Sequence, residues 1–120
     1  MPCIYKITNI KTGKSYVGQT NKTPEERFKR HCAEARWATF RRQPIVEAIH
    51  DEGPEAFKIT LIEEFKPKTR KHTVYNRETY WGLELNTLHP KGYNLRLGKG
   101  PNTVARLTRN RHNTHTRNHR

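Results

Sequence analysis

The chain opens with two short runs in which apolar and polar residues alternate, separated by a glycine-containing turn. Alternation over residues 3–7 and again over residues 16–19 is typical of strands, and the short spacer predicts an antiparallel hairpin. Tyr5 and Tyr16 then lie on neighbouring strands, and Gly18 lets a backbone or a ligand approach closely beside them. The pattern alone fits either an ordinary edge hairpin or one wall of a functional site.

A helix is expected next, from Pro24 to about residue 37. Thr23 is suited to cap it, proline is favoured at the first helical position, and two glutamates follow in the first turn. Its apolar residues recur at helical spacing and should face the core: Phe28, Cys32 and Ala35. Arg27 and His31, four positions apart, flank that apolar stripe and should point together along its edge.

Three further elements follow from the same patterns. Helical spacing after Pro44 predicts a second helix, and breakers at residues 51–54 end it. Apolar and polar residues alternate again over residues 57–62, which predicts a third strand. A third helix is expected over residues 69–85.

Glu78 is the least expected residue of that third helix. It shares one side of the helical wheel, within roughly 60°, with three apolar residues: Val74, Trp81 and Leu85. Desolvating an unpaired carboxylate costs several kcal/mol, so a cation should accompany it. Either a metal ion or a basic neighbour such as Arg27 would serve.

Composition narrows the class of protein. Hydrophobic residues make up only 32% of the 120 residues, which limits the core to one small domain. Lys and Arg number 24 against 11 Asp and Glu, a formal net charge of +13. Such a field attracts polyanions, of which nucleic acid is the commonest. Cys3 and Cys32 lack zinc-site spacing and are expected to be buried thiols rather than ligands of a structural metal.

No apolar run approaches the ~20 residues of a membrane span, and no signal-peptide core follows Met1. We therefore expect an intracellular, cytoplasmic protein without a membrane partner. The composition changes after Gly98, because no acidic residue follows Glu84 and few apolar residues remain. This predicts a folded domain over residues 1–98 and a basic, disordered tail over residues 99–120. The tail is either a phosphate-binding arm or a remnant of a second module.

Six polar residues are left unexplained by these local rules: Tyr5, Tyr16, Arg27, His31, Glu78 and Asn94. Together they suit phosphodiester hydrolysis. One carboxylate is enough to anchor Mg²⁺, which keeps water and phosphate in the rest of its shell and polarises the phosphate. An arginine neutralises charge on the phosphate oxygens, and a tyrosine or histidine can take a proton from water.

At these residues the chain resembles the GIY-YIG nuclease domain, from Cys3 to about Leu97. Five motifs carry the resemblance: Cys3-Ile4-Tyr5, Tyr16-Val17-Gly18, Arg27 with His31, Glu78 within Arg77-Glu78-Thr79-Tyr80-Trp81, and Gly92-Tyr93-Asn94. Cysteine replaces the usual glycine of the first motif, and valine replaces the isoleucine of the second. Each motif is weak alone, but five in order within a short chain are specific.

The resemblance implies an α+β fold, in which a small three-stranded antiparallel sheet is flanked by helices. It also implies a DNA endonuclease that uses one divalent ion, Mg²⁺ or Mn²⁺, and an activated water. The products would carry a 5′-phosphate and a 3′-hydroxyl, and no small-molecule cofactor would take part. Glu78 would hold the metal ion.

The other roles implied by the resemblance fall to the hairpin, the first helix and the closing motif. Arg27 would bind the scissile phosphate, and Tyr5 would position or activate the attacking water. Tyr16 and His31 would share proton transfer and phosphate contacts, in either order. Asn94 would orient the site.

Basic residues spread along the domain are candidates for contacts to DNA phosphates: Lys6, Lys14, Arg27, Arg30, Arg41 and Arg42. Some homing endonucleases of this family carry a second histidine where this chain has Phe40. The role of that histidine is therefore lost here or is taken by the neighbouring arginines. We expect a freestanding, monomeric enzyme of mobile-element or phage character. Two alternatives stay open: a non-catalytic nucleic-acid-binding protein that retains the fold, and a repair- or restriction-type nuclease of the same family.

Overall fold

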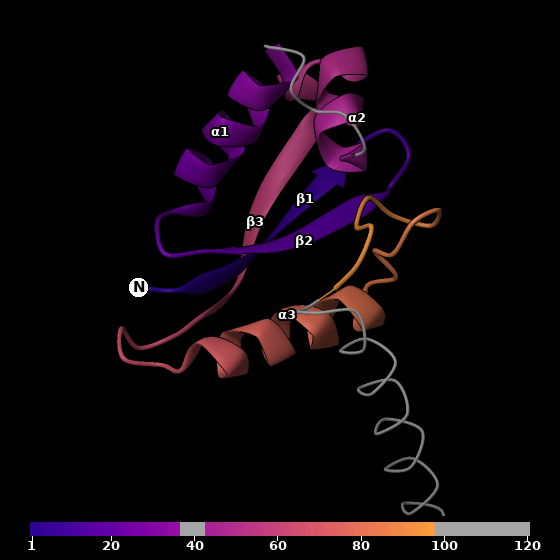
Figure 1. Ribbon diagram of the computed structural model, residues 1–120. Helices are drawn as coiled ribbons and strands as arrows, with labels where there is room; N and C mark the ends of the chain where they lie inside the picture. Colours follow the sequence, from indigo (N-terminus) through magenta and orange to yellow (C-terminus); the bar gives the residue numbers. More distant parts are fainter. Residues whose placement is uncertain (37–42, 98–120) are drawn as a thin grey trace, which may run out of the picture.

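Figure 1 shows the computed structural model, which describes residues 1–36 and 43–97. The elements in order are β1 (Cys3–Asn9), β2 (Ser15–Thr20), α1 (Pro24–Arg36), α2 (Pro44–Glu52), the 3-10 helix η1 (Pro54–Ala56), β3 (Phe57–Glu64) and α3 (Lys71–Glu84). The strands form one antiparallel sheet in the order β2-β1-β3. Helices α1 and α2 lie over one face of the sheet and α3 lies over the other. The expected α+β architecture is confirmed.

Alternation along the central strand β1 divides the interior into two clusters. Tyr5 and Ile7 pack among apolar residues of α1 and α2. The intervening Ile4 packs on the opposite face with Val17 of β2 and Val74 of α3. Burying one side chain of this size contributes about 1.5–3 kcal/mol. Because β1 is covered on both faces, the position of Tyr5 is fixed by the core.

A β-bulge interrupts the pairing of β1 with β3. Ile4 pairs with Glu63, whereas the next residue, Tyr5, pairs with Leu61, so Ile62 is the extra residue on β3. Both Ile62 and Glu63 reach α3 as a result. The predicted strand is present, but its simple alternation breaks at the bulge and leaves Leu61 49% exposed.

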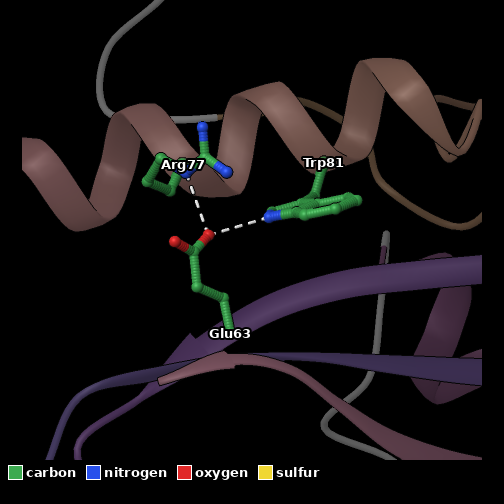
Figure 2. Close-up of polar contacts among 3 residues, drawn as sticks. All are labelled: Glu63, Arg77 and Trp81. Atoms are coloured by element: carbon green, nitrogen blue, oxygen red, sulfur yellow. Dashed lines mark hydrogen bonds and ion pairs between the residues drawn. The ribbon is translucent and has the colours of Figure 1, made fainter. Parts of the chain in front are cut away.

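Glu63 connects β3 to α3 through two hydrogen bonds (Figure 2). Its Oε1 accepts from Arg77 Nε and from Trp81 Nε1, each at 2.9 Å. Burial alone would raise the pKa of the Glu63 carboxyl, but these two bonds and the charge of Arg77 outweigh it and hold that pKa below its usual range. The helix that carries Glu78 is thereby held to the sheet by polar as well as apolar contacts.

Local signals set the ends of the first two helices. The Glu26 N–H donates to Thr23 Oγ1 at 3.1 Å, and the Thr23 N–H donates to Glu26 Oε1 at 3.4 Å, which is a capping box. Helix α2 ends at Gly53, whose φ of 86° is readily adopted only by glycine. The predicted helix starts at Pro24 and Pro44 are confirmed, and the predicted end near residue 37 lies outside the described residues.

Helix α3 is slightly shorter than predicted, and its apolar stripe differs. Val74 is buried as expected, but Leu85 follows the helix and is 37% exposed. Gly82 is buried instead, because the Leu97 side chain fills the space that a Cβ at Gly82 would need. The chain is therefore packed against α3 as far as Leu97. Within residues 1–36 and 43–97, no helix combines the length and apolar character that crossing a membrane requires.

Candidate active site

Tyr5 and Tyr16 come from adjacent strands and meet at Gly18. Tyr5 pairs with Gly18 across the sheet, and its phenol passes over that residue. A Cβ on Gly18 would stand 2.5 Å from Tyr5 Oη and 2.8 Å from Tyr16 Cε2. The two ring centroids are 6.2 Å apart. The close approach predicted at Gly18 is therefore present, and the group that approaches is the Tyr5 phenol.

His31 of α1 lies against both phenols. Its Nε2 is hydrogen-bonded to Tyr5 Oη at 3.1 Å. The imidazole also meets the Tyr16 ring edge-on, with 5.4 Å between centroids. On its other side, Nδ1 lies 3.5 Å from Glu34 Oε1. His31 and Tyr5 are each only 1% exposed, so the hydrogen bond between them is buried.

The imidazole of His31 is neutral near pH 7. Burial lowers its pKa to about 3, and the positive charges of Arg27 and Arg30 add to that effect. The contact with Glu34 is therefore not an ion pair. A carboxylate facing Nδ1 favours the tautomer with its proton on that nitrogen, since a lone pair there would be repelled. In this tautomer Nε2 accepts the hydrogen bond that the Tyr5 phenol donates.

Both phenols are held in the protonated form. Burial raises the pKa of Tyr5 above its ordinary value, the neighbouring Tyr16 adds to the rise, and Arg27 opposes it. Burial also raises the pKa of Tyr16 to about 12, with a further rise from the charge of Glu78. Glu78 acts on Tyr5 as well. Arg27 on α1 and Glu78 on α3 thus both act on the two phenols through their charges. Five of the predicted residues are therefore close to one another: Tyr5, Tyr16, Arg27, His31 and Glu78.

One hydrogen-bond donor of the Arg27 guanidinium has no partner among the described residues. Its Nη1 is buried, and no hydrogen-bond acceptor within residues 1–36 and 43–97 reaches it. Leaving a buried charged donor without an acceptor is costly. Guanidinium groups bind phosphate oxygens in a geometry that suits both partners. The atom is therefore suited to an anion that arrives with a substrate.

Asn94 acts on the hairpin backbone. It is 5% exposed, its Oδ1 accepts from the Val17 N–H and its Nδ2 donates to the Val17 carbonyl, both at 2.9 Å. Val17 stands between Tyr16 and Gly18 in the chain. The Asn94 amide therefore fixes the backbone of β2 between Tyr16 and Gly18.

Glu78 is the residue that the sequence predicts as the ligand of a metal ion. It is half-buried on α3, rather than enclosed in a fully apolar stripe as the sequence suggested. Across the described part of the chain, no group of three His, Cys, Asp or Glu side chains could hold a metal. Mg²⁺ needs only one or two protein carboxylates and takes its remaining ligands from water and phosphate. The side chains present fit an ion of that kind and do not fit a four-ligand zinc site.

The residues predicted to contact DNA do not share one surface. Arg27 and Arg30 lie on α1, where their charges act on His31. Lys14 is exposed in the turn between β1 and β2. Lys6 is half-buried on β1, opposite Val17 on the face that α3 covers. The last two predicted contacts, Arg41 and Arg42, lie outside the described residues.

Two side chains near the site were not identified from the sequence. Glu34 stands three positions after His31 on a helix, and that spacing alone predicts that the two side chains are neighbours. Gln19 lies on β2, and its Nε2 is buried without a hydrogen-bond partner in the described part of the chain. A glutamine near the end of an edge strand carries no sequence signal of this kind.

Comparison with known proteins agrees with the fold and with the resemblance to the GIY-YIG domain. The GIY-YIG catalytic domain family matches residues 1–94. The catalytic domain of the intron endonuclease I-TevI, solved with one Glu-to-Ala substitution, is 27% identical, with a TM-score of 0.70 over 84% of this chain and 100% of that chain. Another structure of the catalytic domain of the homing endonuclease I-TevI is 28% identical, with a TM-score of 0.67 over 80% of this chain and 99% of that chain. No curated protein matches. The chain therefore belongs to the GIY-YIG family, whose catalytic domain it carries over residues 1–94.

Proposed function

We propose that the protein is a DNA endonuclease that hydrolyses phosphodiester bonds with one divalent ion, Mg²⁺ or Mn²⁺, and an activated water. The products carry a 5′-phosphate and a 3′-hydroxyl. The observation that carries the proposal is the buried hydrogen bond between Tyr5 and His31, set beside Tyr16 and within reach of opposite charges from Arg27 and Glu78. The similar solved structures are catalytic domains of an intron homing endonuclease, which supports the same activity.

Arg27 receives the scissile phosphate in this scheme. Its buried Nη1 has a donor to offer, and no side chain within residues 1–36 and 43–97 accepts from it. A phosphate bound there also brings negative charge toward His31, whose pKa is lowered in part by the charge of Arg27. Substrate binding therefore offsets one cause of the low pKa and makes the imidazole a better proton acceptor.

The proton of the attacking water leaves through Tyr5 and His31. A water bound to Tyr5 Oη transfers its proton to that oxygen while the phenol passes its own proton to His31 Nε2, 3.1 Å away. Tyr5 therefore never has to exist as a free phenolate, which its raised pKa would oppose. Tyr16 lies against the same imidazole and is left to contact the phosphate.

Glu78 holds the metal ion. A bound divalent ion would neutralise charge on the phosphate oxygens and stabilise the leaving oxygen. The Glu78 carboxylate lies close enough to both phenols to raise their pKa values, so an ion held there would lie at the same centre. The single carboxylate is consistent with Mg²⁺ or Mn²⁺, which keep several water ligands.

Nicking of supercoiled plasmid with Mg²⁺ or Mn²⁺ tests the proposal. The wild-type protein should nick, and DNA ligase should reseal the nicks because they carry the stated ends. Glu78→Gln should lower the rate at least about 100-fold, since the loss of an ion worth several kcal/mol in the transition state has that size. Glu84→Gln, at an exposed acid of the same helix, should nick like wild type.

Two results would overturn the proposal. If wild-type protein binds DNA and leaves it intact with both ions at low salt, the protein is a nucleic-acid-binding member that retains only the fold. If Glu78→Gln nicks as fast as wild type, the metal assignment is wrong. Mapping cuts on a long substrate then separates a homing-type enzyme, which gives discrete products, from a nuclease without sequence preference.

The proton path has a separate test. Tyr5→Phe and His31→Gln should each lower the single-turnover rate, and the double variant should be no slower than the worse single variant, because residues that act as one unit are not additive. If the two losses multiply, Tyr5 and His31 act independently and the path through both is wrong.

A further inference from the structure

A basic pocket lies where β2 passes into α1. Its volume is about 620 Å³, and its lining comes from the end of β2, the following loop and the first two turns of α1. The lining residues are Thr20, Asn21, Lys22, Glu26, Arg27, Lys29 and Arg30. Arg27 therefore belongs both to the pocket and to the catalytic centre.

The charge of the pocket is strongly positive. Four of its lining residues are cationic, and Glu26 is the one acid among them. The Glu26 carboxylate is already engaged, because its Oε1 accepts from the Thr23 N–H and from Thr23 Oγ1. Among residues 1–36 and 43–97, the buried Arg27 Nη1 has no acceptor, so this cation of the pocket can bind an anion from outside.

The loop that forms one wall of the pocket is held in place by its backbone. The Lys22 N–H donates to Thr20 Oγ1 at 3.1 Å, and the Lys22 carbonyl accepts from Cys3 Sγ at 3.6 Å. Cys3 is 2% exposed and stands where the related motif has glycine. The side chain that this chain adds at the start of β1 therefore anchors the loop that carries Lys22.

The spacing of the cations suits a nucleic-acid strand. Arg27 and Arg30 are three positions apart on α1, which places their Cβ atoms about 5–6 Å apart. One DNA strand carries a phosphate for about every 3.4 Å of the helix axis. Arg30 also lowers the pKa of His31 by its charge, so it lies near the catalytic centre. A strand whose scissile phosphate lies on Arg27 would bring its next phosphates to the pocket.

We propose that this pocket binds the DNA backbone phosphates that flank the scissile one on the same strand, through Lys22, Lys29 and Arg30. The inference rests on the proposed function, since it takes the scissile phosphate to lie on Arg27. These contacts position the strand and read no bases. They add a salt-dependent share of the affinity for DNA of any sequence.

Fluorescence anisotropy with a labelled 30-base-pair duplex, in EDTA so that no cutting occurs, measures this share. The test variant is Lys22→Gln/Lys29→Gln/Arg30→Gln. The control is Lys11→Gln/Lys58→Gln/Lys91→Gln, which removes the same charge from exposed positions outside the pocket. The plot of the logarithm of the binding constant against log[salt] has a negative slope. The magnitude of this slope should be smaller in the test variant by about 0.9 for each phosphate that the variant no longer binds. In the control variant the slope should keep its wild-type value. The three single variants, with unchanged thermal unfolding, guard against a fold defect.

Equal slopes in the test and control variants would overturn the inference, because binding would then follow net charge alone. A second arm places one uncharged methylphosphonate beside a mapped cut position. This substitution should slow wild-type cutting and have less effect on the test variant, which already lacks the cation that binds there, while equal slowing in both would also overturn it. Failure of the proposed function is distinct: the wild-type protein would not cut at all, whatever its salt slope.

Discussion

Replacing Gly18 with alanine should damage catalysis far more than it damages the fold. The new Cβ would stand 2.5 Å from Tyr5 Oη, 2.7 Å from Tyr5 Cζ and 2.8 Å from Tyr16 Cε2. Non-bonded carbon atoms prefer about 3.5–4.0 Å, so the rings must move by about 1 Å. Overpacking of this kind costs about 1–3 kcal/mol of stability. Misplacing a reacting group by about 1 Å costs about 100-fold in rate, and the hydrogen bond from Tyr5 to His31 would be broken or lengthened.

Gly13→Ala is the matched control for that substitution. Gly13 has a φ of 80°, and nothing lies within 4 Å of the place its Cβ would take. Alanine there strains the backbone by about 1–2 kcal/mol and touches no catalytic group. Urea unfolding should report a similar loss for both variants, whereas single-turnover nicking with Mg²⁺ should fall only in Gly18→Ala. If Gly18→Ala folds and nicks as fast as Gly13→Ala, the placement of the phenols over Gly18 has no catalytic role.

Three further predictions concern stability. The unfolded chain protonates His31 near its ordinary pKa of 6.5, whereas the folded chain does so only at a pKa of about 3. The free energy of unfolding should therefore be unaffected above pH 6.5 and should fall by up to about 1.4 kcal/mol per pH unit below it. The urea midpoint of His31→Gln should fall less steeply than that of wild type between pH 6.5 and 4, and equal slopes would contradict this prediction. Glu63→Gln should cost about 1 kcal/mol at pH 7. That difference should vanish as the pH falls through the depressed pKa of Glu63, and Trp81 fluorescence can follow it. Asn94→Leu leaves the Val17 N–H and carbonyl without partners, so thermal unfolding should show a loss of about 2–5 kcal/mol, and a loss below about 1 kcal/mol would mean that water replaces the amide.

The parts of the fold that could be predicted from the sequence are those that short-range interactions determine. Thr23 caps α1 and Gly53 ends α2 through contacts within a few residues, and the alternation that predicts β1 is contained in seven consecutive residues. The bulge at Ile62 could not be predicted in this way. It depends on which residues of β1 the third strand meets, and the contacts of both faces of the sheet fix that register together.

The candidate site was predicted as a set of residue types, and its geometry was not. The motif spacing identified Tyr5 and His31, but only the crossing of the phenol over Gly18 explains their hydrogen bond. Cys3 replaces the usual glycine of the first motif. The structure gives it a contact, because the strand begins beside the loop that carries Lys22. Contacts of this kind join residues that no local rule relates.

In the proposed mechanism, the two arginines of α1 act both on the phosphate and on the proton acceptor His31. A proton acceptor works best when its pKa is near the operating pH, yet burial and the charges of Arg27 and Arg30 lower the pKa of His31 far below that. Those same charges attract the phosphate, and a bound phosphate cancels part of their effect on the imidazole. In the proposed mechanism, substrate binding therefore makes His31 a better base, while burial, the larger cause of its low pKa, remains. The proposed mechanism thus couples proton removal to the arrival of the strand, because Arg27 lines the basic pocket and its charge also acts on His31.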